Sequence, residues 1–119
     1  MKASFQSYLN ISAASYQQLL RLAKYKSATK GALIFHPDRT CRKIIFIEQG
    51  LLRGYRIIDG KEYTHHFFST HWFATDFRSF LTGRPGSLYI EALTNCQYYE
   101  FPKDKLEALY AAHHDLERL

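Results

Sequence analysis

With 119 residues, the chain has the length of one ordinary domain and is too short to bury two separate cores. Apolar residues make up 46% of the sequence and aromatic residues 16%, which excludes a disordered chain. Ten basic and two acidic residues give the first 56 residues a charge of +8, whereas six basic and nine acidic residues give the remainder −3. This basic half could steer an anionic partner such as nucleic acid or RNA polymerase. We therefore expect a single domain over residues 1–119.

The sequence also bears on the cellular compartment. No segment has the roughly 18 consecutive apolar residues of a membrane helix, and the first ten residues lack the pattern of a signal peptide. Cys41 and Cys96 form neither a Cys-x-x-Cys motif nor a Cys/His spacing, which argues against a disulfide framework or a zinc site. We predict a cytoplasmic protein with no membrane segment.

The first half of the chain predicts one helix followed by three strands. Over residues 12–26, apolar residues recur at helical spacing, and Ser12 and Ser15 are suitable N-caps. Residues 32–35 form a short apolar strand that Pro37 and Asp38 end in a turn. Residues 43–47 are β-branched and aromatic, and Gly50 separates them from a similar strand over residues 51–58.

The second half continues with strands and ends in a helix. Asp59-Gly60 is a strong hairpin signal, so residues 62–68 should pair antiparallel with residues 52–58. The later elements are expected to be a short helix over 76–81, strands over 88–93 and 97–101, and a helix from Lys103 onward. Short strands separated by turns predict a mostly β fold, an antiparallel jelly roll with N- and C-terminal helices. Six aromatic residues are expected in its core, some of them lining a shallow pocket: Phe67, Phe68, Trp72, Phe73, Phe77 and Phe80.

Residues 45–55 resemble a signature of a known family. Two apolar strands joined at Gly50 are similar to the strand-glycine-strand signature of the cyclic nucleotide-binding domain. Later motifs follow in the family's order: Asp59-Gly60, Phe67-Phe68 and Trp72-Phe73. The similarity covers residues 12–119, and in its details it resembles the catabolite-activator and fumarate-nitrate-regulator (Crp/Fnr) superfamily of bacterial transcription regulators. The resemblance implies a sensory domain with a ligand cavity and no enzymatic activity.

The family's phosphate-binding cassette can be matched to this sequence. Its opening Gly-Glu pair corresponds to Thr75-Asp76, and the arginine near its closing end corresponds to Gly86. Asp76 could still accept a hydrogen bond from a ligand hydroxyl, and Ser87 could donate to a phosphate. The candidate ligand-binding residues are Thr75, Asp76, Phe77, Arg84, Gly86, Ser87 and Leu88.

Gly86 argues against tight binding of cyclic AMP. Loss of the arginine removes a charge-assisted contact of about 1.5 to 3 kcal/mol, which lowers the affinity about tenfold or more. Three interpretations stay open: binding of cyclic AMP at micromolar strength, an altered cavity for another small ligand, or no ligand at all. No cofactor is expected. Replacing Gly86 with Arg should restore measurable affinity if the rest of the cavity is intact.

The cluster of His65-His66 and His71 supports an alternative interpretation, a small cupin-like metal-dependent enzyme. Adjacent strand residues point to opposite faces, so at most one of His65-His66 should face the interior of the roll. The cupin His-x-His pattern is absent, Glu91 is the available carboxylate, and the later His113-His114 lie on the final helix. We therefore expect no metal site and no catalytic residue.

The resemblance also implies partners. A regulator of this superfamily is expected to be a homodimer that binds DNA through a helix-turn-helix domain, and the basic half could contact RNA polymerase. The sequence contains no helix-turn-helix, so it is interpreted as a sensory domain that does not itself read a DNA sequence.

Overall fold

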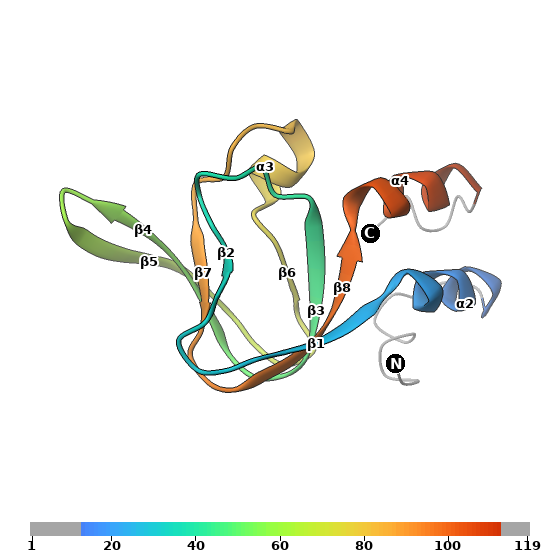
Figure 1. Ribbon diagram of the computed structural model, residues 1–119, viewed down its shortest axis with the longest axis horizontal. Helices are drawn as coiled ribbons and strands as arrows, with labels where there is room; N and C mark the ends of the chain where they lie inside the picture. Colours follow the sequence, from blue (N-terminus) through green and yellow to red (C-terminus); the bar gives the residue numbers. More distant parts are fainter. Residues whose placement is uncertain (1–12, 113–119) are drawn as a thin grey trace.

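Antiparallel strands form two four-stranded sheets that enclose a core (Figure 1). The computed structural model describes residues 13–112, and side chains over residues 17–109. One sheet has the strand order β1-β8-β3-β6, formed by Lys24–Ala28, Cys96–Pro102, Lys43–Gln49 and Phe73–Ala74. The other has the order β2-β7-β4-β5, formed by Leu33–Phe35, Tyr89–Ala92, Leu52–Ile58 and Lys61–Phe68. The helices are α2 (Ala13–Leu22), α3 (Phe77–Thr82) and α4 (Lys103–Ala112). The predicted antiparallel roll with flanking helices is confirmed.

Both faces of β3 are buried, which explains its continuous apolar run. Ile45 and Ile47 belong to the core between the two sheets. Phe46, between them in sequence, points to the opposite face and joins a second cluster with Leu19, Phe101 and Leu106. Helices α2 and α4 supply part of this cluster and lie side by side against the first sheet (Figure 1). No helix within residues 13–112 is long and apolar enough to span a membrane.

The predicted hairpin between β4 and β5 is confirmed, with one irregularity. Its turn residues Asp59 and Gly60 have φ values of 52° and 79°, the positive values that this turn requires. Gly54 pairs with His66, but the next residue along β4 pairs with Thr64. His65 is therefore an extra residue in β5, and the strand contains a β-bulge.

The predicted helix over residues 12–26 is wrong at its C-terminal end. Helix α2 ends at Leu22, and the next residues form β1, which pairs antiparallel with β8. In β1, the ring of Tyr25 lies 4.9 Å from that of Tyr99, measured between centroids. Such contacts depend on residues more than 70 positions away, so local periodicity does not reveal them. The two-residue strand β6 was also not predicted, whereas the predicted strands agree with the structure within two residues at each end.

The aromatic residues between positions 67 and 80 are less buried than predicted. Phe67, Trp72 and Phe77 each expose more than half of their surface. Phe68 is buried in the core between the sheets. Phe67 faces outward because side chains alternate along this part of β5. The prediction that these residues belong to the core is therefore wrong for Phe67 and Trp72, whereas Phe77 lines a cavity, as was expected of some members of this set.

Candidate functional site

Asp76 joins the opening and the closing ends of the cassette. It is the N-cap of α3, where its Oδ1 accepts a hydrogen bond from the amide of Ser79 at 3.3 Å. Its Oδ2 accepts from the amides of Ser87 at 2.8 Å and Leu88 at 3.2 Å. A carboxylate offers about four lone-pair positions, so these donors leave about one for a ligand. The amides of Ser87 and Leu88 are thus already bound to an anionic group of the protein itself.

Gly86 lies at a position with no room for a side chain. Its amide donates to the carbonyl oxygen of Arg39 at 3.0 Å. A Cβ atom at this position would lie 2.9 Å from Asp76 Oδ2 and 3.3 Å from the carbonyl oxygens of both Arg39 and His36. Asp76 cannot easily move away, because three amides hold its carboxylate. The expectation that Gly86→Arg restores affinity if the rest of the cavity is intact stays a prediction, and an arginine here would require the surrounding segment to shift.

The loop between β2 and β3 holds the cassette in place. The amide of Cys41 donates to Ser79 Oγ at 2.6 Å, and Ser79 Oγ donates to the carbonyl oxygen of Arg84 at 2.5 Å. Thr75 Oγ1 donates to the carbonyl oxygen of Lys43 at 2.7 Å and lies 3.1 Å from the thiol of Cys41. The hydroxyls of Thr75 and Ser79 are therefore engaged within the protein.

A cavity of about 270 Å³ lies between the β4–β5 hairpin and the cassette, and we call it the cassette cavity. Five of the seven predicted site residues line it: Thr75, Asp76, Phe77, Ser87 and Leu88. Gly86 and Arg84 are not among its lining residues. Most of the residues matched to the cassette thus line one cavity, whereas Gly86, which corresponds to the family's arginine, and the nearby Arg84 do not.

The remaining lining residues were not among the predicted ligand-binding residues, although Phe68 belongs to the aromatic set expected in part to line a pocket. Most of them come from the hairpin: Arg56, His65, His66, Phe68 and Arg78. Because of the bulge, both histidines line the cavity, with their ring centroids 6.5 Å apart. Both side chains are exposed, so lining this open cavity does not place either of them inside the roll, and the prediction that at most one of the pair faces the interior is not contradicted. Arg56 could have been found from the hairpin register, but the sequence gives no sign of the bulge.

Arg56 lines the cassette cavity and carries an unpaired donor. Its Nε atom is buried and has no hydrogen-bond partner among the described residues. An unpaired buried donor costs about 1 to 3 kcal/mol, and a ligand acceptor could recover part of that cost. Arg78 of α3 adds a second positive charge to the same lining. The lining therefore combines two positive side chains, Arg56 and Arg78, with the carboxylate of Asp76.

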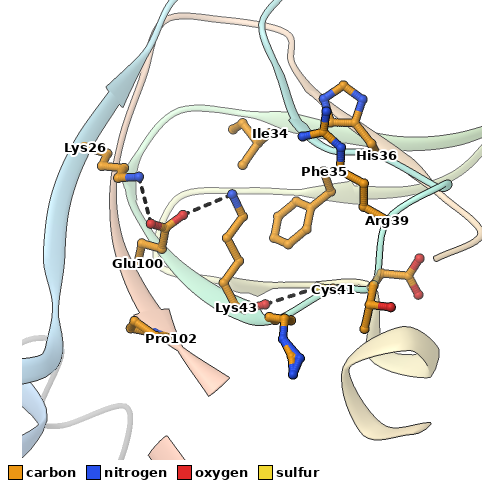
Figure 2. A pocket seen from close by; sticks show the side chains of 12 residues that line it. Lys26, Ile34, Phe35, His36, Arg39, Cys41, Lys43, Glu100 and Pro102 are labelled. Atoms are coloured by element: carbon orange, nitrogen blue, oxygen red, sulfur yellow. Dashed lines mark hydrogen bonds and ion pairs between the residues drawn. The ribbon is translucent and has the colours of Figure 1, made fainter. Parts of the chain in front are cut away.

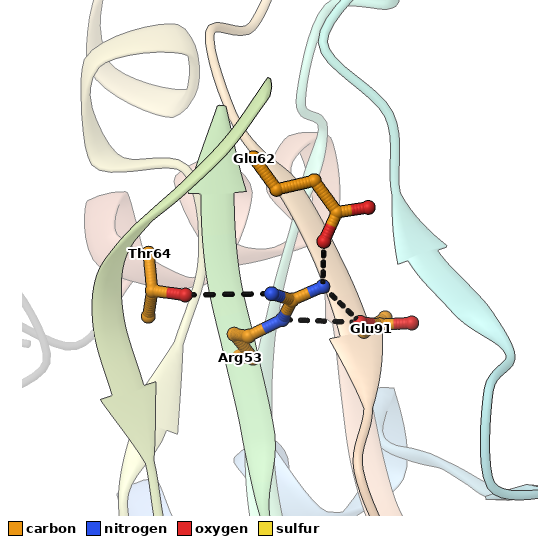
Figure 3. A network of polar contacts seen from close by, with 4 residues as sticks. All are labelled: Arg53, Glu62, Thr64 and Glu91. Atoms are coloured by element: carbon orange, nitrogen blue, oxygen red, sulfur yellow. Dashed lines mark hydrogen bonds and ion pairs between the residues drawn. The ribbon is translucent and has the colours of Figure 1, made fainter. Parts of the chain in front are cut away.

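Glu91, the carboxylate considered for a metal site, takes part in a different interaction. It lies on β7 and forms an ion pair with Arg53 of β4 at 2.5 Å, while Arg53 also contacts Glu62 at 2.8 Å (Figure 3). The guanidinium of Arg53 lies 4.0 Å from the ring centroid of Tyr55. Among the described residues, no three His, Cys, Asp or Glu side chains lie close enough together to hold a metal ion. His113-His114 lie outside the described residues.

Comparisons with known proteins agree with this architecture. The fold is similar to the sensor domain of the transcriptional regulator DNR from Pseudomonas aeruginosa, with a TM-score of 0.85 and 17% identity over 96% of this chain and 79% of that one. It is also similar to the catabolite activator protein of Thermus thermophilus, with a TM-score of 0.81 and 14% identity over 98% of this chain and 54% of that one. The chain thus spans about half the length of the activator protein.

A third similar structure contains a ligand. The regulatory domain of Toxoplasma gondii PKA, solved with cAMP, has a TM-score of 0.79 and 13% identity over 89% of this chain and 41% of that one. No curated protein matches the sequence. The family model described as the cyclic nucleotide-binding domain matches residues 25–113, about three quarters of the chain. The chain therefore belongs to the cyclic nucleotide-binding domain family.

Proposed function

We propose that this chain is the sensory domain of a bacterial Crp/Fnr-type transcription regulator and binds cyclic AMP weakly or not at all. One observation carries the proposal: the carboxylate of Asp76 accepts hydrogen bonds from the amides of Ser87 and Leu88. The resemblance adds that Gly86 corresponds to the family's arginine, and a Cβ atom at this position would lie 2.9 Å from Asp76 Oδ2. A phosphate at this end of the cavity would lie beside a carboxylate, with no guanidinium at position 86 to offset the cost of burying its charge. Weak binding follows from this arrangement.

The cassette cavity favours a different small ligand. The unpaired Nε of Arg56 and the guanidinium of Arg78 support a ligand that presents an acceptor or a negative group to the hairpin side. The exposed ring of Phe77 and the buried ring of Phe68 offer apolar contact to the rest of the ligand. In this proposal the domain is a binding module and not an enzyme.

The proposal also concerns the full-length regulator to which this domain would belong. We infer a cytoplasmic homodimer that binds DNA through a helix-turn-helix domain and contacts RNA polymerase. These properties are proposals, because the chain spans 54% of the activator protein that it resembles. Sequencing the gene beyond codon 119 provides a test. A helix-turn-helix there supports the regulator, and an unrelated catalytic domain would count against it.

Thermal unfolding in the presence of nucleotides tests the ligand proposal. Cyclic AMP or cyclic GMP at about 10 μM should raise the Tm by less than about 1 °C, because stabilisation scales as RT ln(1 + [L]/Kd). The regulatory domain of Toxoplasma gondii PKA, whose solved structure contains cAMP, serves as the positive control in the same buffer. A shift of several degrees, or micromolar binding by calorimetry, would show that the cassette still functions.

A further inference from the structure

A second cavity, of about 360 Å³, opens beside the loop between β2 and β3, and we call it the lysine cavity (Figure 2). Its lining comes from this loop and from β1, β2, β3 and β8. Buried Ile34 and Phe35 form an apolar part of the wall. Four basic side chains line it, Lys26, Arg39, Arg42 and Lys43, against the acidic residues Asp76 and Glu100. None of the hairpin residues of the cassette cavity takes part.

Glu100, one of the two acidic residues of this cavity, forms ion pairs with two lysines. The buried carboxylate of Glu100 lies between the ammonium groups of Lys26 and Lys43, at 2.8 and 3.0 Å (Figure 2). The hydrogen bond to Glu100 raises the pKa of Lys26. Burial tends to raise the pKa of Glu100, but the hydrogen bonds from the two lysines outweigh it and lower that pKa. Lys26 and Glu100 are therefore charged at neutral pH.

The lysines keep donors for a ligand. Each ammonium group has three N–H donors. One oxygen of Glu100 pairs with Lys26 and the other with Lys43, so each lysine keeps donors for a further partner. The ammonium of Lys43 also lies 5.1 Å from the ring centroid of Phe35, so the apolar wall and the charge adjoin. Arg39 is exposed on the loop, and its guanidinium takes part in none of the ion pairs of the described residues. Asp76, the other acidic residue, is turned toward backbone amides.

We propose that the lysine cavity binds a small molecule that carries a phosphate or pyrophosphate group, held by Lys26, Lys43 and Arg39. Its lining has two more positive than negative side chains, which matches a dianionic group. Ammonium and guanidinium groups are the side chains that proteins use most for phosphate. The organic part of the ligand would lie against Ile34 and Phe35. Of its lining residues, this site shares only Asp76 with the cassette cavity, and none of its three proposed ligand-binding residues lines that cavity, so the cyclic nucleotide experiment above does not test it.

Calorimetric titration with inorganic pyrophosphate tests the site. The unmodified chain should bind it with a Kd below about 1 mM, which corresponds to a modest affinity. Arg39→Gln and Lys26→Met should each weaken binding about fivefold or more, because each removes a charged donor. Lys61→Gln is the matched control: it removes one charge at the exposed hairpin turn and should change the Kd less than about twofold.

Three results would overturn the proposal. The first is no measurable binding of pyrophosphate at about 5 mM, the second an equal loss in Lys61→Gln and Arg39→Gln, and the third succinate binding as tightly as pyrophosphate. Unfolding curves of each variant check that it folds. Arg39→Gln keeps the experiment decisive if Lys26→Met is unstable, because Arg39 contributes only backbone hydrogen bonds, to His36 and Gly86, within the described residues.

Discussion

Replacing Asp76 with Asn tests whether its carboxylate holds the cassette together. The substitution keeps the shape of the side chain, but it removes the charge and replaces one oxygen with an NH₂ group. The wild-type carboxylate accepts from the amides of Ser79, Ser87 and Leu88. The single oxygen of asparagine can face the pair at Ser87 and Leu88 or the amide of Ser79. In either orientation its NH₂ group then meets at least one N–H donor.

The cost can be worked from these three contacts. If the asparagine oxygen keeps the hydrogen bonds from the amides of Ser87 and Leu88, each bond becomes weaker by about 1 kcal/mol, which is the difference between a charged and a neutral acceptor. The unpaired amide of Ser79 costs about 1 to 3 kcal/mol more, because Ser79 is buried. The total is about 3 to 5 kcal/mol, against roughly 6 to 18 kcal/mol for a domain of this length. The Tm should fall by roughly 10 to 20 °C.

Urea unfolding followed by circular dichroism measures this difference. Asp59→Asn is the matched control, because asparagine tolerates the positive φ of the hairpin turn as well as aspartate does. We expect it to change the free energy of unfolding by less than about 0.5 kcal/mol. If Asp76→Asn stayed within about 1 kcal/mol of wild type, the carboxylate would not be holding the cassette, and the reasoning would be refuted.

Two further substitutions probe the same region and the lysine cavity. Gly86→Ala should destabilise the domain by about 1 to 3 kcal/mol, because its Cβ would lie 2.9 Å from Asp76 Oδ2. Ser87→Ala, which keeps the amide that Asp76 binds, is its control in urea unfolding, and equal effects of the two would contradict the packing argument. Glu100→Gln should cost about 1 to 2 kcal/mol at pH 7, less than a fully buried ion pair, because the Lys26 and Lys43 side chains are 47% and 31% exposed. The pKa of Glu100 is lowered from 4.5 in the folded state, so its contribution is complete above that value and is lost as the pH falls through the folded-state pKa. The difference in the free energy of unfolding between Glu100→Gln and wild type should therefore shrink below about pH 4.5. An unchanged difference at pH 3 would exclude a stabilising ion pair between Glu100 and the two lysines.

Local signals in the sequence were sufficient for most of the strands. Asp59-Gly60 defines its hairpin because few residues other than Gly, Asn and Asp accept positive φ at both turn positions. Strand β1 was not predictable in this way, because Lys24–Ala28 forms its strand by pairing with β8, which lies near the other end of the sequence. The apolar spacing of α2 continues to Ala23, which accounts for the error in its predicted end.

The site was predictable only in part. The resemblance identified Thr75, Asp76 and Ser87, and these line the cassette cavity. It could not show that Asp76 turns toward amides eleven and twelve residues later, because this depends on how the two ends of the cassette meet in space. His65 is a single unpaired residue in its strand, for which the sequence has no local signal, so the presence of both His65 and His66 in the cavity lining could not be predicted.

The extra residue in β5 also bears on how the specificity of the cassette cavity can change during evolution. Deletion of one codon at position 65 or 66 would restore an uninterrupted ladder with β4, in which side chains alternate strictly between the two faces. One imidazole would then be lost from the cavity wall in a single genetic event, with the rest of the roll unchanged. In this hairpin, strand length determines which chemical groups a ligand meets, so descendants of this gene could acquire new ligands through insertions and deletions as well as through substitutions.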